Sequence, residues 1–582
     1  MLRLLFSTVY DPAPLMDRWS ATDQMAYRLT RGQGIFTLRE HAHAWPLHLL
    51  AQNVACESVV LEWPSLEEFE QECAADDYDF VCITFMNRDL TKLGAMTEVV
   101  RRRLPRAKIV VGGYGVICVP DHRAPREHVD YDHICRGEGV HFLRELAGED
   151  TTRPVSCLLP QSGAVLPWLS RRNRGTVGAL LAGLGCIQRC PFCVTSFYTR
   201  GRFLGVLDER ELYEGMRRYW QVNPFTSTVN IYDENFLDYK ERVDQLGGYL
   251  REDREYGLRR LNYFTFGSIS ALAKYDPVEL LRNGLDTVWI GVESRYSRLK
   301  KLRGAEPEDV FATLHGLGIK TVGSFILGLD IQNQETVLAD EDFFVGLDPT
   351  YQQISILTVE PNMPLARVYQ NQRQKRTYPW ENYHLYGQTY EPKNFTFDEL
   401  LNRVDALYRR LYEENGPSIM RMLRVNLNGF QFCRGSSDQL LRDQKADFFA
   451  RRVRSYAPLL PACIEFAPSE RVRTLLRDIQ CELEETFGAP DDGQRMFSEH
   501  VLRKAASEYA LRGTGDPPLH LEEFKRYVYP VAARRAAVVK PYTTSYPRRL
   551  PPRTASPTRA CESGETTAAP PALRPGVLEI GA

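Results

Sequence analysis

The stretch LGCIQRCPFC, residues 184–193, places three cysteines at the spacing CxxxCxxC in a chain that has 13 cysteines in 582 residues. A short loop of this kind bends three thiolates toward one face of an iron–sulfur cubane, whose irons prefer soft thiolate ligands. The next cysteine along the chain is Cys433, so one iron of a [4Fe-4S] cluster is expected to lack a protein ligand. A zinc knuckle is the alternative, but it requires a second Cys or His pair, and none follows. The sequence therefore predicts a cluster held by Cys186, Cys190 and Cys193.

This loop, with the aromatic Phe192 directly before its third cysteine, resembles the cluster motif of the radical S-adenosylmethionine (SAM) enzymes. The resemblance implies that the open iron chelates the amino and carboxylate groups of SAM. It also implies that the reduced cluster cleaves SAM and releases a 5′-deoxyadenosyl radical, with an electron from a donor such as flavodoxin or ferredoxin.

The composition is that of an ordinary globular protein, with 43% hydrophobic and 25% charged residues. A formal net charge of −2 gives no reason to expect nucleic acid or an anionic membrane as a partner. No apolar run approaches the ~18–20 residues of a spanning helix, and the apolar start of the chain is too short for a signal peptide. Free cysteines and a cluster motif fit a reducing compartment, so we expect a cytoplasmic protein without a membrane span.

Residues 1–147 alternate short apolar strands with helical segments, which predicts a doubly wound, Rossmann-like parallel sheet. The expected strands are Leu2–Ser7, Ser58–Leu61, Phe80–Phe85 and Lys108–Gly113, and His133–Cys135 leads into the turn Gly137-Glu138-Gly139. The expected helices are Trp45–Cys56, Leu66–Cys73 and Leu93–Leu104. Ligands of such sheets bind beyond the carboxyl ends of the strands, where several glycines fall. Residues 148–175 show little periodicity and are expected to form a linker.

Two glycine turns of this domain resemble the cobalamin-binding domain that precedes the radical domain in one branch of the family, the class B-like methyltransferases. Val110-Val111-Gly112-Gly113 stands at a strand end, and Gly137-Glu138-Gly139-Val140 matches a Gly-Glu-Gly-Glu turn whose last Glu is replaced by Val. Asp79–Phe85 followed by Asn87 resembles the segment that contacts the nucleotide tail of the corrin. The resemblance implies a cobalamin site formed by Thr84, Asn87, Gly112, Gly113, Gly137 and Glu138.

The same domain allows other interpretations. It has no DxHxxG loop, so the resemblance implies cobalamin without a histidine ligand on cobalt. Gly113-Tyr114-Gly115 is half of a dinucleotide fingerprint, but Cys118 replaces its third glycine, and the glycines could do no more than turn the chain. His41, His43 and His48 could bind a metal, although we expect them to line the start of a helix.

Residues 176–396 repeat a strand–helix pattern and are expected to form a partial (β/α)6 radical SAM barrel. Its expected strands are Gly178–Leu181, Thr228–Tyr232, Tyr263–Phe266, Val288–Ser294, Thr321–Gly328 and Gln353–Leu357. Barrel enzymes carry their chemistry at the carboxyl ends of the strands, and polar residues follow several strands here.

The resemblance assigns SAM to residues at those strand ends. Asp233, Glu234 and Asn235, after the second strand, would hold the SAM amino group, and Glu293 and Ser294, after the fourth, would contact its polar parts. The cation Arg303 would meet its carboxylate. Gly323 and Gly328 would lie beside its adenine. Each carboxylate alone could instead be a solvated surface acid. Pro361–Leu365 departs from the family's Pro-Gly-Thr-Pro-Leu sequence and receives no role.

Residues 397–545 are expected to form a helical C-terminal domain. Its expected helices are Leu400–Leu411, Ser437–Ala457, Val472–Phe487, Met496–Leu511 and Leu521–Tyr529. In the family such additions usually cover the barrel mouth and shape the substrate site. Residues 546–582 are rich in Pro, Thr, Ala and Arg and are expected to be a disordered tail.

The resemblance, which covers about residues 1–395, implies a cobalamin-dependent radical SAM methyltransferase. Its substrate would be a small molecule with an unactivated carbon, where polar methyl transfer fails and a radical is needed. The same cofactors could instead serve a rearrangement, cyclisation or ring contraction without methyl transfer. A non-catalytic iron–sulfur protein that relays electrons is a third possibility, but it would need no SAM site.

Overall fold

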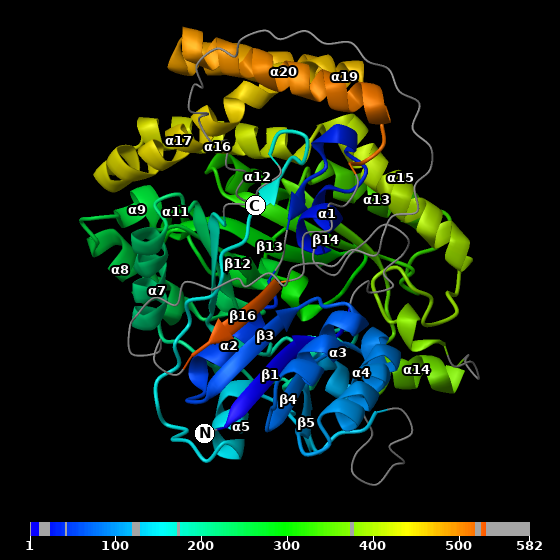
Figure 1. The fold of residues 1–582 in the computed structure, drawn as a ribbon. Coiled ribbons are helices and arrows are strands. Elements are labelled where there is room, and N and C mark those ends of the chain that lie inside the picture. The colour runs from blue at the N-terminus through cyan, green and yellow to red at the C-terminus, as the bar shows by residue number, and fades with distance from the viewer. Residues whose placement is uncertain are drawn as a thin grey trace, which may run out of the picture.

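The computed structural model describes residues 2–10, 24–40, 43–118, 129–170, 175–372, 378–517 and 525–530. Figure 1 shows three parts: an N-terminal sheet with its helices at the bottom, a barrel in the middle, and C-terminal helices at the top. The expected α/β architecture is confirmed, with two parallel sheets and a helical C-terminal region. The expected tail lies outside the described residues.

The N-terminal sheet has six strands in the order β16-β3-β1-β4-β5-β6, and all neighbours except β16 and β3 pair in parallel. Helices α2 and α5 cover one face, and α3 and α4 cover the other. The strands are β1 (Arg3–Thr8), β3 (Glu57–Glu62), β4 (Phe80–Thr84), β5 (Lys108–Gly112) and β6 (His133–Ile134). The helices are α2 (Trp45–Asn53), α3 (Leu66–Ala75), α4 (Leu90–Arg103) and α5 (Gly139–Leu146). The doubly wound arrangement is therefore confirmed.

The sixth strand of this sheet comes from the other end of the chain. Strand β16 (Lys525–Tyr529) pairs antiparallel with β3, and Tyr527 lies opposite Val60. The expected helix over Leu521–Tyr529 is wrong for these five residues. Figure 1 shows β16, in orange, lying along the blue β3.

The barrel sheet is fully parallel, with the strand order β15-β14-β13-β12-β11-β8. Its strands are β8 (Val177–Leu181), β11 (Thr228–Tyr232), β12 (Tyr263–Gly267), β13 (Leu285–Glu293), β14 (Lys320–Leu327) and β15 (Tyr351–Ile356). Its outer helices are α7 (Glu209–Val222), α8 (Lys240–Glu252), α9 (Gly257–Arg260), α10 (Ile269–Leu272), α11 (Pro277–Arg282), α12 (Pro307–Gly316), α13 (Thr336–Gly346) and α14 (Pro364–Gln372). All six expected strands are present, because each is a short run of buried β-formers between turn residues.

A segment from the N-terminal region enters the barrel rather than the N-terminal sheet. Helix α1 (Gln24–Thr30) contacts β15, and its Ala26 and Leu29 share a hydrophobic cluster with barrel side chains. The following strand β2 (Arg39–Glu40) pairs with β7 (Ala164–Val165), which lies within the expected linker. Residues 24–40 and the linker therefore strap the two sheets together.

The C-terminal helices pack at the amino ends of the barrel strands, so the expectation that they cover the barrel mouth is wrong. At that end Lys320, at the start of β14, donates to Asn426 of α16 at 3.2 Å, and Arg421 donates to Gln352 at 2.7 Å. The helices are α15 (Phe397–Asn415), α16 (Ser418–Gly435), α17 (Ala446–Tyr456), α18 (Leu460–Glu465), α19 (Glu470–Phe487) and α20 (Asp492–Arg512). The sequence pattern missed α16, which is buried along most of its length.

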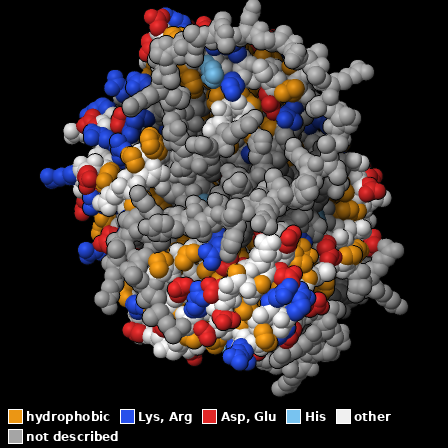
Figure 2. All heavy atoms as spheres, in the orientation of Figure 1, with side chains coloured by type: hydrophobic (Ala, Val, Ile, Leu, Met, Phe, Trp, Pro, Cys, Tyr) orange, Lys and Arg blue, Asp and Glu red, His pale blue; other side chains and the backbone are white. Residues whose placement is uncertain are grey.

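None of the helices in the described ranges is both long enough and apolar enough to cross a membrane. On the face in Figure 2, acidic and basic side chains are interspersed over the N-terminal domain at the bottom. The described side chains there form no patch of a single charge, in keeping with the net charge of −2 for the chain.

Candidate functional site

The cluster loop leaves the barrel after β8 and is held by tight backbone packing. Strand β9 (Gly183–Leu184) pairs with β10 (Leu204–Gly205), and the short helix α6 (Val194–Tyr198) follows the third cysteine. Gly185 has φ +93°, and a side chain there would collide with the carbonyl of Arg202. Only glycine tolerates both constraints, so Gly185 fixes the entry of the loop.

The three thiols lie near one another beside the barrel mouth. Burial raises the pKa of Cys186, and it raises the pKa of Cys190 to about 11; the charge of Cys193 adds to both shifts. The sulfur atoms of these three cysteines do not all lie within 4.8 Å of one another. A single zinc ion requires such a tight group, whereas a cubane spreads its ligands over separate irons. The loop therefore fits a cluster better than a zinc ion.

A buried ion pair lies next to the cluster loop. Glu293 has φ +63° at the end of β13, and its carboxylate pairs with the ammonium of Lys301. Lys301 also lies over the ring of Phe192, 5.9 Å from its centroid. Burial acts to lower the pKa of Lys301, but Glu293 and Cys190 outweigh it and raise the pKa. Gly291 makes room for the pair, because a Cβ there would strike both charged groups.

The structure places Lys301 beside the cluster loop, whereas the sequence analysis suggested Arg303 as the cation for the SAM carboxylate. The side chain of Arg303 is exposed, whereas Lys301 belongs to a short 3-10 helix (Lys300–Leu302) that turns it inward. Four positions, Lys300 to Arg303, hold three cations, and a sequence pattern cannot decide which one faces the cluster. Lys301 is therefore a candidate that the sequence analysis missed.

The residues after β11 provide polar atoms that no described group uses. Asp233 is 3% exposed, and its Oδ2 has no hydrogen-bond partner; the nearest cation, Nη1 of Arg242, is 3.8 Å away. Burial raises the pKa of Asp233 to about 7. The Oδ1 atom of Asn235 is also buried without a partner. Such atoms are costly unless a ligand satisfies them, so they fit a group such as the ammonium of SAM.

Glu234 has a different role from its neighbours. One carboxylate oxygen accepts from the hydroxyl of Tyr114 at 2.9 Å, and the other accepts from the backbone N–H of Gly185 at 2.6 Å. Tyr114 belongs to the N-terminal domain and Gly185 to the cluster loop. Glu234 therefore ties the N-terminal domain to the loop through a single side chain.

Three further candidates for SAM have structural partners instead. The hydroxyl of Ser294 donates to Asp340 of α13 at 2.6 Å, and a Cβ at Gly323 would lie 3.0 Å from Pro349 on the outer side of the barrel. Gly328 has φ +85° and lies against the hydroxyl of Tyr390, which donates to its carbonyl at 2.6 Å. The chain itself therefore holds these three residues in place, and their assignment to SAM stays a prediction.

A cavity of about 490 Å³ lies between the N-terminal sheet and the barrel mouth. Five of the six residues assigned to cobalamin line it: Thr84, Gly112, Gly113, Gly137 and Glu138. The sixth, Asn87, is not part of this lining and donates to Glu360, a buried carboxyl whose pKa burial raises to about 7. The far wall is formed by barrel residues, Leu181, Leu184, Tyr232 and Glu234. The cavity therefore joins the sheet's carboxyl edge to the cluster loop.

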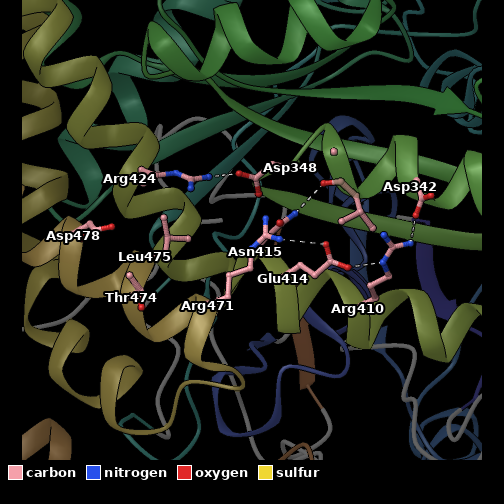
Figure 3. Close-up of a pocket in the computed structure, with 12 residues that line it drawn as sticks. Asp342, Asp348, Arg410, Glu414, Asn415, Arg424, Arg471, Thr474, Leu475 and Asp478 are labelled. Carbon is pink, nitrogen blue, oxygen red and sulfur yellow. Dashed lines mark hydrogen bonds and ion pairs between the residues drawn. The ribbon is translucent and has the colours of Figure 1, made fainter.

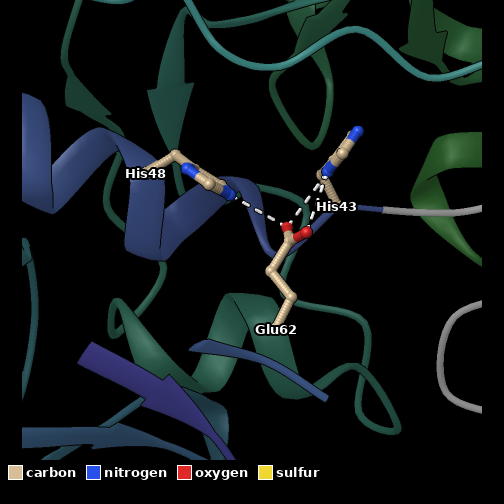
Figure 4. Close-up of side chains that lie close together, drawn as sticks. All are labelled: His43, His48 and Glu62. Carbon is tan, nitrogen blue, oxygen red and sulfur yellow. Dashed lines mark hydrogen bonds and ion pairs between the residues drawn. The ribbon is translucent and has the colours of Figure 1, made fainter. Parts of the chain in front are cut away.

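His43 and His48 converge on Glu62, as Figure 4 shows. Nδ1 of His43 lies 3.0 Å and Nε2 of His48 lies 2.9 Å from the Glu62 carboxylate, which also accepts from the N–H of Ala44 at 2.7 Å. Nδ1 of His48 lies 2.5 Å from the hydroxyl of Tyr529 in β16. The three side chains offer ligand atoms within 4.8 Å of one another, but hydrogen bonds account for all of them. The group thus joins the start of α2 to β16, and His41 lies outside the described residues.

A second cavity of about 520 Å³ lies on the opposite side of the barrel from the cluster, among α13, α15, α16 and α19. Figure 3 shows Arg410 between Asp342 and Glu414, at 2.7 and 2.6 Å, and Arg424 facing Asp348. Most of its charges are paired with one another, and it contains none of the candidate site residues. It is an open, charged groove of the surface rather than a reaction site.

Comparison with known proteins points to the same part of the chain. The model of the radical SAM superfamily matches residues 180–344. An uncharacterized methyltransferase of Pyrococcus horikoshii is 22% identical over 392 residues, 60% of this chain and 84% of that protein. The bacteriochlorophyllide d C-12(1)-methyltransferase of Chlorobaculum tepidum is 25% identical over 260 residues, 42% of this chain and 53% of that protein.

Two solved structures of the radical SAM methyltransferase TsrM from Kitasatospora setae also resemble this chain. The one with tryptophan and a SAM analogue bound is 17% identical, covers 78% of this chain and 100% of its own, and has a TM-score of 0.49. The one with cobalamin and a [4Fe-4S] cluster is 16% identical, covers 78% and 99%, and has a TM-score of 0.45.

The segment that matches the superfamily begins in β8 and ends in α13. It contains the three cysteines, the polar residues after β11 and the Glu293–Lys301 pair. Residues 180–344 therefore form a radical SAM domain.

Proposed function

We propose that this chain is a cobalamin-dependent radical SAM methyltransferase that places a methyl group on an unactivated carbon of a small molecule. Both curated relatives are named as methyltransferases, which supports methyl transfer. The observation that carries the cobalamin assignment is the cavity of about 490 Å³ that is shared by the N-terminal sheet and the barrel mouth.

The cavity wall suits a large, flat cofactor. Its N-terminal side consists mostly of glycines and apolar side chains at the carboxyl ends of parallel strands, where such sheets bind ligands. Gly112 and Gly137 allow the backbone to approach a ligand closely, and a Cβ at Gly137 would meet no atom within 4 Å. A cofactor held there would lie between the sheet and Tyr232 of the barrel.

The chain's own groups then have separate tasks. Cys186, Cys190 and Cys193 would hold the cluster, and Asp233 would bind the SAM ammonium with its unused oxygen. Lys301 would meet the SAM carboxylate, with Glu293 holding it in place. When bound, the cluster and SAM supply a carbon radical that removes a hydrogen atom from the substrate, and cobalamin supplies the methyl group that replaces it. The mostly apolar wall of the cavity would help to keep water away from that radical.

The first test measures cofactor content after anaerobic reconstitution. We expect about four irons per chain and one cobalamin without a histidine nitrogen on cobalt. Cys193→Ala should lose the iron, whereas Cys481→Ala, at an exposed cysteine, should keep it. Gly112→Trp should exclude cobalamin but keep the iron, because a Cβ at Gly112 meets only Cys135, at 3.6 Å, and the larger side chain would fill the cavity. Cobalamin bound equally well by Gly112→Trp would refute this cavity as its site.

The second test measures products once a substrate is supplied. Methyl transfer consumes two SAM molecules, so 5′-deoxyadenosine and S-adenosylhomocysteine should form in a ratio of about one to one. SAM with a deuterated methyl group should add three deuterons to the product. A product without added mass, formed with 5′-deoxyadenosine alone, would replace methyl transfer by rearrangement. No SAM cleavage at all would favour an electron relay.

A further inference from the structure

Helix α6 connects the cluster loop to the N-terminal domain. It begins directly after the third cysteine, and the hydroxyl of its Ser196 donates to the backbone carbonyl of Cys186 at 3.1 Å. Two neighbouring rings of this helix pack in different parts of the molecule. Phe197 packs against the hydrophobic cluster of the barrel, whereas Tyr198 packs against the hydrophobic cluster of the N-terminal sheet. The helix is therefore fixed by both parts of the molecule at once.

The hydroxyl of Tyr198 binds both backbone groups of Gly137. It accepts a hydrogen bond from the N–H of Gly137 at 2.9 Å and donates one to the carbonyl of the same residue at 2.9 Å. Gly137 has φ +138°, a conformation that residues with a side chain rarely adopt, and it lines the cavity of about 490 Å³ together with Tyr198. A side chain next to the cluster loop therefore holds one wall of the proposed cobalamin site in place.

A second contact reaches the cluster loop at its other end. Tyr114, which also lines the cavity, donates to Glu234, and Glu234 accepts from the N–H of Gly185 directly before the first cysteine. The rings of Tyr114 and Tyr198 meet edge to face, with their centroids 5.1 Å apart. The three cysteines therefore lie between two contacts with the cavity wall, and these two contacts touch each other.

These contacts give the two cofactor sites a common framework. A ligand that orders the turn at Gly137 also restricts Tyr198 and, through it, the helix that follows the third cysteine. A cluster that then assembles in the loop loses less conformational entropy, because part of the ordering has already taken place. Such coupling is reciprocal, so the cluster must strengthen the binding of that ligand by the same factor.

We propose that Tyr198 is a positioning residue that couples the two cofactor sites: cobalamin held against Gly137 stabilises the iron–sulfur cluster, and the cluster strengthens cobalamin binding. This coupling rests on the proposed function, because it takes the cavity as the cobalamin site. A chain without cobalamin would hold its cluster less firmly, which limits SAM cleavage where the methyl donor is missing. Tyr198 acts through Gly137 and α6 and takes no part in the radical chemistry.

The first experiment measures the dissociation constant of hydroxocobalamin for two forms of the protein, one with the cluster reconstituted and one without iron. The cluster-loaded wild type should bind at least about fivefold more tightly than the iron-free form, the lower end of the usual coupling between sites. Tyr198→Phe keeps the ring but removes the hydroxyl that contacts Gly137, so it should lose most of this difference. An undiminished difference in Tyr198→Phe would overturn the proposal.

The wild type alone separates the coupling from the proposed function. Binding of hydroxocobalamin that is equally tight in the two forms would refute the coupling and leave the cobalamin site in place. No binding to either form would instead refute the proposed function.

Tyr219→Phe is the matched control. The hydroxyl of Tyr219 accepts from the N–H of Leu159 at 2.8 Å and donates to the carbonyl of the same residue at 3.1 Å. Leu159 lines the same cavity, but Tyr219 belongs to α7, which carries none of the three cysteines. This variant should keep the full difference between the two forms. If it lost the difference as Tyr198→Phe does, any damage to the cavity wall would explain the effect, and the proposal would be wrong.

The second experiment measures how fast the reconstituted protein loses its iron to the chelator EDTA, with and without bound hydroxocobalamin. Cobalamin should slow this loss in the wild type and in Tyr219→Phe, but much less in Tyr198→Phe. The two rates are compared within each variant, because a general loss of stability speeds the release of iron in both samples alike. A cobalamin effect of the same size in all three proteins would overturn the proposal.

Discussion

The two ends of the barrel treat buried charge in opposite ways. We call the amino ends of the barrel strands the base. There Asp286 pairs with Lys320, and Nη2 of Arg452 lies 3.8 Å from Oδ2 of Asp286. These cations outweigh burial and lower the pKa of Asp286. The carboxyl ends of the strands form the barrel mouth. There burial raises the pKa of Asp233 to about 7, and one oxygen of that carboxylate has no hydrogen-bond partner.

This difference separates stability from function within one sheet. The base lies under the C-terminal helices and buries its carboxylate with several cations, so its charges hold those helices to the barrel. The mouth keeps a buried carboxylate oxygen, Oδ2 of Asp233, without a hydrogen-bond partner, which weakens the unliganded protein. In barrel enzymes the carboxyl ends of the strands carry the chemistry and the amino ends carry stability, and the present charges follow that division.

The largest effect is expected at the base. Asp286→Ala leaves Lys320 and Arg452 buried without their carboxylate, which should lower the free energy of unfolding by about 3–5 kcal/mol. Urea unfolding measures the change. Asp342→Ala, which removes the partner of Arg410 on the surface, is the control and should cost less than about 1 kcal/mol. If the two variants were equally stable, the base would not depend on its buried ion pair.

Removal of the buried carboxylate at the mouth, that of Asp233, should raise the free energy of unfolding instead of lowering it. The folded-state pKa of Asp233 lies near 7, above the ordinary value of 3.8, so the wild type loses stability as the pH rises from about 4 to 7. Asp233→Asn removes this loss and should raise the stability of the unliganded protein at pH 8 by about 1–3 kcal/mol.

Asp233→Asn should also weaken SAM binding, which calorimetry of the reconstituted protein measures. The matched control is Asp286→Asn, an identical chemical change at the base, which should lower stability at pH 8. A lower stability of both variants at pH 8 would mean that the mouth is no different from the base.

The smallest effect concerns the hydrogen bond between Tyr114 of the N-terminal domain and Glu234 of the barrel. Tyr114→Phe removes the hydroxyl that donates to Glu234 and should cost about 1 kcal/mol. It should also speed hydrogen exchange at the amide of Gly185, which donates to the same carboxylate. Tyr78→Phe removes a similar bond to Glu72 within the N-terminal domain and should leave Gly185 unchanged. Unchanged exchange at Gly185 in Tyr114→Phe would show that Glu234 does not couple the two parts.

The sequence predicted the strands well because each depends on local features. The second barrel strand was expected at Thr228–Tyr232 and is found there, since its apolar run ends at an acidic turn. Helix α16 was missed because its apolar residues are spread around the helix, as a fully buried helix requires. Strand β16 was missed because its partner, β3, lies more than 460 residues away in the sequence.

The site was harder to predict than the fold. The cysteines carry their spacing in the sequence, whereas the orientation of Lys301 depends on the turn that carries it. Asn87 of the N-terminal domain donates a hydrogen bond to Glu360 of the barrel part. A contact between residues so far apart in the sequence leaves no local sequence pattern.

Strand β16 also sets the order in which the protein can be completed. The ribosome makes the first five strands of the N-terminal sheet early, but the strand that covers the edge of β3 follows only after the barrel and the C-terminal helices. Until then β3 offers an open edge, the kind of surface through which partly made chains aggregate. The hydroxyl that contacts His48 arrives with the same strand. His43 and Ala44, which line the proposed cobalamin cavity, are therefore held by the completed group of His43, His48 and Glu62 only after β16 has been made.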